Sequence, residues 1–163
     1  MCSDDYYMQI ALEEAKKSID SGDIPIGAVV VIDEEIISMA HNTKEKDGLV
    51  TAHAEISAIN KASQVLGRYR LDGGTIYITK EPCLMCMGAI LSSRIAKIVY
   101  GAKDLRFGTE YLAKDNNFNH KCDIVGGILA DECAELITEF FKELRGNNES
   151  RRKTNNITKE ESQ

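Results

Sequence analysis

Residues 75–86 read TIYITKEPCLMC, and the predicted fold class follows from this segment. Residues 75–79 are β-branched and aromatic, which predicts a strand, and the proline that follows suits the first turn of a helix over residues 84–93. Residues 95–100 predict a second strand. Strand, helix and strand then form a unit with the usual right-handed crossover. The cysteines of this stretch therefore lie at the beginning of a helix, at one end of a sheet.

A second motif, TAHAE, lies upstream at residues 51–55 and supplies a histidine. His53, Cys83 and Cys86 together offer one imidazole and two thiolates, which are three protein ligands for zinc and leave the fourth tetrahedral position open for water. An open position is typical of a catalytic zinc site. Glu55, two residues beyond His53, is placed to handle a proton of that water without binding the metal.

Both motifs begin helices. Apolar residues recur at helical spacing after His53, and Gly67 is placed to end that helix. The unpaired N–H groups of a helix N-terminus favour thiolate over thiol and support negative charge that develops at the metal. The backbone N–H groups near Ala54 and Cys83 are candidates for that second role.

Two other interpretations of the cysteine pair are weaker. A thioredoxin-like redox pair leaves Glu55 without a role. A structural zinc site needs a fourth protein ligand, but the remaining histidines, His41 and His120, lie in predicted loops without metal spacing.

The rest of the chain predicts an α/β protein with one domain, residues 1–145. An amphipathic first helix, which Gly22 is placed to end, is followed by a hairpin over residues 24–40. A short strand at 122–125 and a final helix complete the domain. Residues 146–163 contain one large apolar side chain, so we expect a polar, disordered tail.

Composition indicates a soluble protein without a membrane segment, and the acidic, polar N-terminus predicts a cytoplasmic location with free thiols. The net charge of −6 argues against a generally basic nucleic-acid binder, so any RNA contact must be local. A basic cluster crosses the junction of the last helix and the tail. It can serve RNA binding or simply be a solvated helix end; its members are Lys142, Arg145, Arg151, Arg152 and Lys153.

The zinc motif is characteristic of the superfamily of zinc-dependent nucleobase deaminases. Further blocks along the chain narrow the resemblance to one family. These blocks are IPIGAV (24–29), HN (41–42), AHAE (52–55), EPCLMC (81–86), SRI (93–95), GAKD (101–104), NH (119–120) and GILADEC (127–133). Over roughly residues 5–145, the chain resembles the bacterial tRNA-specific adenosine deaminases.

The resemblance implies a cytidine-deaminase-like three-layer α/β/α sandwich around a five-stranded mixed sheet. It also implies a homodimer that binds one zinc ion per subunit and converts the wobble adenosine of a tRNA anticodon loop to inosine. The positions of His53, Cys83 and Cys86 would bind zinc and that of Glu55 would shuttle protons. That of Asn42 would contact the nucleoside, and that of Asp104 would lie near the RNA backbone. Phe140 is either core or a stacking partner for the substrate.

One segment departs from the family pattern, because residues 101–119 are shorter and lack its Gly-rich helix start. A short loop beside the pocket is reminiscent of the free-base cytosine deaminases of the same superfamily. The alternative is therefore a small-molecule nucleobase or nucleoside deaminase that acts on cytosine, guanine or adenine. A catalytically silent subunit that only binds RNA or a partner is a further one, but intact Glu55 argues against it.

Overall fold

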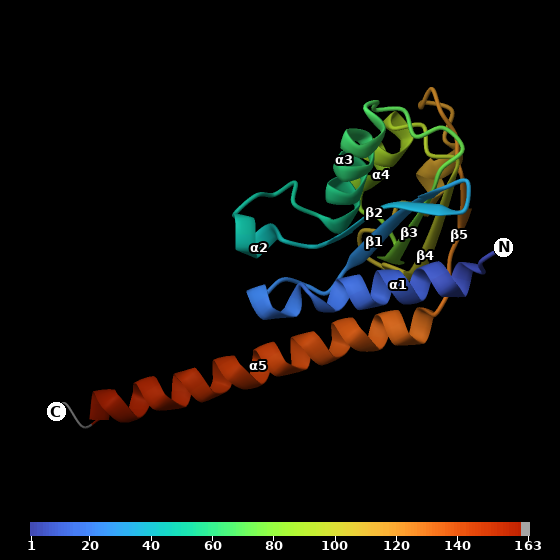
Figure 1. Ribbon diagram of the computed structural model, residues 1–163. Helices are drawn as coiled ribbons and strands as arrows, with labels where there is room; N and C mark the ends of the chain where they lie inside the picture. Colours follow the sequence, from blue (N-terminus) through green and yellow to red (C-terminus); the bar gives the residue numbers. More distant parts are fainter. Residues whose placement is uncertain (161–163) are drawn as a thin grey trace.

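The computed structural model describes the backbone of residues 1–160 and the side chains of residues 1–154. Five strands form one mixed sheet in the order β2-β1-β3-β4-β5 (Figure 1). β1 is antiparallel to both of its neighbours, whereas β3, β4 and β5 run parallel. The strands are β1 (Gly27–Ile32), β2 (Glu35–His41), β3 (Thr75–Lys80), β4 (Lys97–Ala102) and β5 (Asp123–Val125).

Helices cover both faces of the sheet, with α3 and α4 on one side and α1 and α5 on the other (Figure 1). The predicted three-layer α/β/α sandwich is therefore confirmed, and β3, α4 and β4 form the predicted parallel unit. The helices are α1 (Asp4–Lys16), α2 (Lys44–Asp47), α3 (Ala54–Leu66), α4 (Leu84–Ser92) and α5 (Ala130–Glu160), with 3₁₀ turns η1 (Ile19–Ser21) and η2 (Glu110–Lys114).

Alternate residues of the central strands point into the two cores. In β3, Ile76 and Ile78 pack in the core under α3 and α4, while Tyr77 packs in the core under α1 and α5. Because both faces are buried, these strands read as nearly continuous apolar runs and not as polar and apolar residues in alternation. The same burial fixes the register, since a slip by one residue would exchange the two faces.

α1 lies directly on β1 at Gly27. A Cβ atom at this position would overlap the carbonyl oxygen of Ala11 and the backbone nitrogen of Ala15. The Gly27 N–H donates to Thr79 Oγ1 at 3.1 Å, which ties β1 to β3 beside this contact. Glycine is therefore required here for space.

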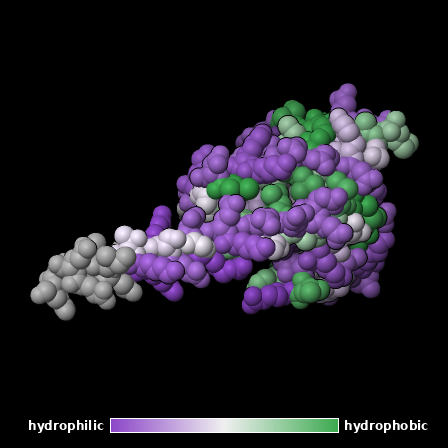
Figure 2. All heavy atoms as spheres, turned by 90° about the horizontal axis from the view of Figure 1, so that it is seen from below, coloured by the Kyte–Doolittle hydropathy of each residue, from purple (hydrophilic) through white to green (hydrophobic). Residues whose placement is uncertain are grey.

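The C-terminal helix corrects one expectation. We predicted that the last helix ends near Gly146 and that a disordered tail follows, but α5 continues through Gly146 to Glu160. One glycine costs a helix only about 1 kcal/mol, and the segment has no proline to stop it. All side chains from residue 141 to 154 are exposed, so this part of α5 projects from the body with a largely hydrophilic surface (Figure 2). The division into a domain and a tail stays a prediction, and residues 161–163 lie outside the described part.

No helix among the described residues combines the length and the apolar character that crossing a membrane requires.

Candidate active site

The three predicted ligands meet at the N-terminal ends of α3 and α4. His53 Nδ1 lies 3.7 Å from Cys83 Sγ and 3.6 Å from Cys86 Sγ. Tetrahedral zinc, with bonds of about 2.1 Å to nitrogen and about 2.3 Å to sulfur, separates such ligand atoms by about 3.5 Å. The donor set and its spacing therefore fit a zinc ion.

Local structure explains why these side chains converge. His53 and Cys83 are the N-cap residues of α3 and α4, both with extended backbone, and neither side chain caps its own helix. The imidazole and the thiol point toward each other instead. Cys86 follows Cys83 by one helical turn and is buried. In the described part of the chain, the group holds no fourth His, Cys, Asp or Glu, which leaves one tetrahedral position open.

The other histidines are engaged elsewhere. His41 Nδ1 lies 2.8 Å from Glu14 Oε1, and His120 Nε2 lies 2.7 Å from the carbonyl oxygen of Ile95. Neither belongs to the ligand group, which argues against a structural zinc with four protein ligands.

Hydrogen bonds within the ligand group shift the pKa values of its members. A hydrogen bond from Cys86 and another from His53 outweigh burial and lower the pKa of Cys83 to about 4. The same interaction with Cys83, together with burial, raises the pKa of Cys86. The hydrogen bond to Cys83 also raises the pKa of His53. A divalent cation replaces these protons and accepts both thiolates, so metal binding here releases protons.

Glu55 lies in the first turn of α3 and is buried beside the ligand group. Burial is the main reason that the pKa of its carboxyl is raised, since the charged form loses hydration. Glu55 is not a member of the ligand group. A buried carboxyl whose pKa is raised, held near an open metal position, is suited to accept and return a proton.

Asn42 is held from three sides and still has a free oxygen. Its backbone N–H donates to Ile26 at 3.0 Å, its side-chain Nδ2 donates to Ile24 at 3.3 Å, and its carbonyl accepts from Ser18 Oγ at 2.7 Å. Asn42 Oδ1 is buried and has no hydrogen-bond partner among the described residues. A buried acceptor without a partner is costly, and a ligand that donates a hydrogen bond would remove that cost.

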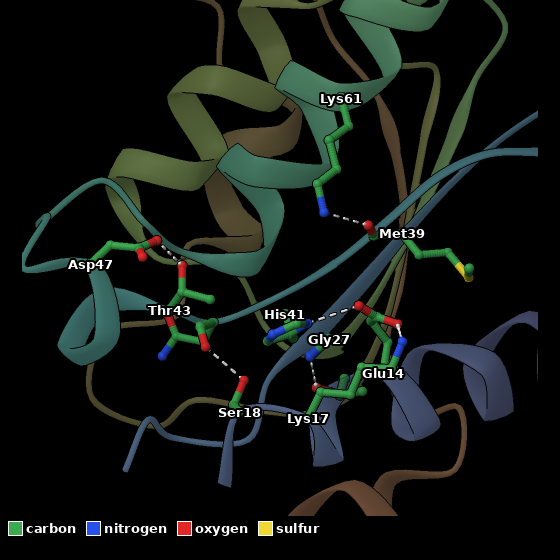
Figure 3. Close-up of polar contacts among 11 residues, drawn as sticks. Glu14, Lys17, Ser18, Gly27, Met39, His41, Thr43, Asp47 and Lys61 are labelled. Carbon is green, nitrogen blue, oxygen red and sulfur yellow. Dashed lines mark hydrogen bonds and ion pairs between the residues drawn. The ribbon is translucent and has the colours of Figure 1, made fainter. Parts of the chain in front are cut away.

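Polar contacts from α1 support this strand end (Figure 3). The buried Glu14 carboxylate pairs with His41, the residue before Asn42, and with Lys17 Nζ at 2.7 Å. Lys17 and His41 lower the pKa of Glu14, although burial opposes them. Asp23 is fully buried and accepts the backbone N–H groups of Glu45 and Lys46, so it holds the beginning of α2 beside the same strand end.

The carboxylate of Asp104 is already engaged within the protein. Its Oδ2 lies 2.9 Å from Lys80 Nζ, and its Oδ1 accepts the backbone N–H groups of Arg106 and Phe107 at 3.0 Å each. Asp104 thus organises the loop after β4. Its predicted position near an RNA backbone is compatible with this place but stays a prediction.

Known proteins resemble this chain in sequence and in fold. Residues 2–145 match the family model described as MafB19-like deaminase. The tRNA-specific adenosine deaminase of Bacillus subtilis is 44% identical over 157 residues, covering 94% of this chain and 98% of that protein. The chain belongs to the tRNA-specific adenosine deaminase family. The similarity to this relative therefore extends over nearly the whole length of both chains.

Solved structures agree with the deaminase family. A structure from a study of A-to-I editing by tRNA:A34 deaminases at the wobble position has 37% identity and a TM-score of 0.77, covering 80% of this chain and 98% of that one. A guanine deaminase from Nitrosomonas europaea has a TM-score of 0.75 over 86% of this chain and 85% of its own. At 22% identity, that second likeness shows the fold alone.

Ala54 and Phe140, the two other residues that we predicted to contact the substrate, lie on opposite faces of the sheet. Ala54 is the buried first residue of α3, so its backbone N–H is among those without a partner in the helix. Phe140 is buried on α5, on the opposite face of the sheet from α3 and α4, with its ring centroid 5.4 Å from that of Phe141. A role for either in substrate binding stays a prediction.

Sequence reasoning missed the residues that support the site. Glu14, Ser18 and Asp23 carry no motif, because their roles arise from contacts with residues far along the chain. Glu81 had a signal, since it directly precedes the Pro-Cys-x-x-Cys motif. It is buried, and its Oε2 accepts the N–H of Asp104 at 3.0 Å.

Proposed function

We propose that this chain is a zinc-dependent enzyme that deaminates adenosine to inosine at the wobble position of tRNA. The observation that carries the proposal is the convergence of His53, Cys83 and Cys86 around an open position, with buried Glu55 beside them. Family membership supplies the substrate class, since relatives of this similarity are named tRNA-specific adenosine deaminases.

His53, Cys83 and Cys86 would hold one zinc ion per subunit. When bound, zinc supplies an activated water near neutral pH. Glu55 would accept one proton of that water and pass it to a ring nitrogen of adenine, which makes C6 more electrophilic, and the water oxygen would form a bond to C6. Glu55 would then take the remaining proton of the new C6 hydroxyl and give it to the exocyclic amine. The bond from C6 to this nitrogen breaks, ammonia leaves and the carbonyl of inosine remains.

Asn42 orients the nucleoside through the free Oδ1, which accepts a hydrogen bond from the substrate. The backbone N–H groups at the beginnings of α3 and α4 support the developing negative charge. The target base lies in an anticodon loop, where unstacking costs less than in a duplex. The working form would be a cytoplasmic homodimer that binds the anticodon loop of tRNA.

The test is inosine formation by the zinc-loaded protein on an anticodon stem-loop with adenosine at the wobble position. Glu55→Ala is the control, because it removes the proton carrier and leaves the three ligands. Inosine with the wild type and none with Glu55→Ala is the expected result. Ammonia release from free cytosine, guanine or adenine, without inosine in the RNA, would replace the tRNA substrate by a small base. Zinc loss in Glu55→Ala would make Glu55 a ligand and overturn its assigned role.

A further inference from the structure

A short loop beside the ligand group carries exposed aromatic side chains. Phe107 is 64% exposed and Tyr111 is 74% exposed, and Leu84, the first residue of α4, is 65% exposed. Together they line a cavity of about 360 Å³. The residues of its wall are Cys83, Leu84, Met85, Arg106, Phe107, Gly108, Thr109 and Tyr111. Since Cys83 belongs to both, the cavity adjoins the metal ligands directly.

The loop is held in a defined shape although its side chains are exposed. Thr109 is buried, and its hydroxyl donates to the carbonyl oxygen of Pro82 at 2.8 Å. Glu81 Oε1 accepts the N–H of Glu110 at 3.0 Å, and a Cβ atom at Gly108 would overlap the Glu81 carboxylate. Exposed rings on an ordered loop bind a ligand with little loss of conformational entropy.

The side chain of Arg106 lies over the exposed ring of Phe107. The Arg106 guanidinium is 5.3 Å from the centroid of Phe107. Among residues 1–154, whose side chains are described, Arg106 forms no ion pair. Its charge is therefore available for a phosphate, and its plane and the phenyl ring both suit stacking with a base.

We propose that Phe107 and Arg106 bind the unpaired nucleotide next to the target adenosine, with the base stacked on Phe107 and the phosphate near Arg106. This inference rests on the proposed function. The occupant follows from the position of the cavity: Cys83 lines it and also belongs to the ligand group, so a nucleotide covalently linked to a base at that group lies next to this loop. A free base has no such neighbour and would leave these side chains unused.

The chain contains no tryptophan, so Phe107→Trp introduces a single fluorescent reporter. With the zinc-loaded protein and the anticodon stem-loop, Phe107→Ala should raise KM about tenfold, the scale of one base stacked on an aromatic ring, and leave kcat within about twofold. Phe107→Trp should restore KM, and RNA binding should quench its emission. The matched control is Tyr69→Ala, because Tyr69 is 70% exposed beyond the C-terminal end of α3, away from the ligand group.

Three results would overturn the inference. An unchanged KM for Phe107→Ala, while wild type forms inosine, refutes the stacking role alone. Dissociation of a dimer in Phe107→Ala, seen by sedimentation, would assign the surface to contact between copies of the chain. No inosine with the wild type refutes the proposed function, and the stacking role with it.

Discussion

The carboxylate of Glu81 accepts the backbone N–H of Glu110 at 3.0 Å, although 29 positions separate the two residues. Glu81 stands two positions before the ligand Cys83, and its other oxygen accepts the N–H of Asp104. One buried side chain thus places the loop after β4 relative to the metal ligands. The geometry of that loop and that of the ligand group are therefore coupled.

Removing this carboxylate should free the loop. Glu81→Ala leaves two N–H groups without their acceptor and should lower the free energy of unfolding by about 1–3 kcal/mol. Hydrogen exchange of the backbone amides of Asp104 and Glu110 should become at least about tenfold faster, because each N–H loses the Glu81 carboxylate oxygen that accepts it. NMR measures these two exchange rates. Glu13→Ala, at an exposed site on α1, should change neither amide, and equal protection in Glu81→Ala would contradict the anchoring role.

Metal removal should affect both activity and stability. A strong chelator should abolish inosine formation and lower the Tm, since the cation stabilises the ends of α3 and α4 only in the folded state. Cys83→Ser should lose zinc in elemental analysis, while Cys2→Ser, at an exposed thiol outside the ligand group, should retain it. Full activity after chelation to a metal-free state would exclude the metal from the reaction.

Replacing Asn42 by alanine should reduce activity much more than it reduces the stability of the fold. Asn42→Ala removes the bond to Ile24 but also removes the buried oxygen without a partner, so the free energy of unfolding should change by less than about 1 kcal/mol. The value of kcat/KM should fall by about tenfold or more, because the nucleoside loses its acceptor. Urea unfolding and steady-state kinetics on one preparation separate these effects. A large loss of stability at unchanged kcat/KM would make Asn42 purely structural.

The Glu14–His41 pair should appear in the acid dependence of stability. The pKa of Glu14 is held below its usual value of 4.5, so this group stabilises the fold fully above about pH 4.5, and the stabilisation is lost as the pH falls below that value. Glu14→Gln should be less stable near neutral pH by about 1–3 kcal/mol and should show a shallower decline in acid. Urea unfolding from about pH 3 to 7 measures both, with Glu139→Gln on exposed α5 as control. Parallel curves for Glu14→Gln and wild type would refute the linkage.

The projecting end of α5 should contribute to RNA affinity through charge. Replacing Arg145, Arg151, Arg152 and Lys153 by glutamine should weaken binding of tRNA. The slope of log K against log salt should also become shallower, by about 0.7–0.9 for each phosphate contact that is lost. Replacing the exposed Arg70 in the same way is the control, because Arg70 belongs to a local ion pair with Asp72 after the end of α3. Equal affinity and an equal slope would show this basic end to be solvated only.

The sequence predicted the parts of the fold that depend on local pattern. Apolar runs such as residues 75–79 and 95–100 identified β3 and β4, and Gly67 ends α3 in the left-handed conformation as expected. The motifs also predicted that His53, Cys83 and Cys86 come together, because metal chemistry demands specific residue types at specific spacing. Both motifs lie at the beginnings of helices, α3 and α4. The prediction that β3, α4 and β4 form a parallel unit put the cysteines at one end of the sheet.

Contacts between distant segments could not be predicted in this way. Nothing in the sequence indicates that Glu14 meets His41 or that Asp23 holds the beginning of α2, because a carboxylate on a helix is usually solvated. The end of α5 was missed for a different reason. A polar composition with no apolar stripe argues against packing, but it does not prevent a helix from continuing on its own hydrogen bonds.

Gly27 limits which substitutions this deaminase can accept. Because α1 lies on the backbone at that position, any larger residue must move α1, and α1 carries Glu14 while the turn after it carries Ser18. Both residues support the segment that presents Asn42. A substitution far from the pocket in sequence would therefore disturb the recognition of the nucleoside. In a library selected for new substrates, position 27 should stay glycine in the survivors, while substitutions should accumulate at the exposed side chains of Arg106 and Phe107, which contact the substrate in our proposal.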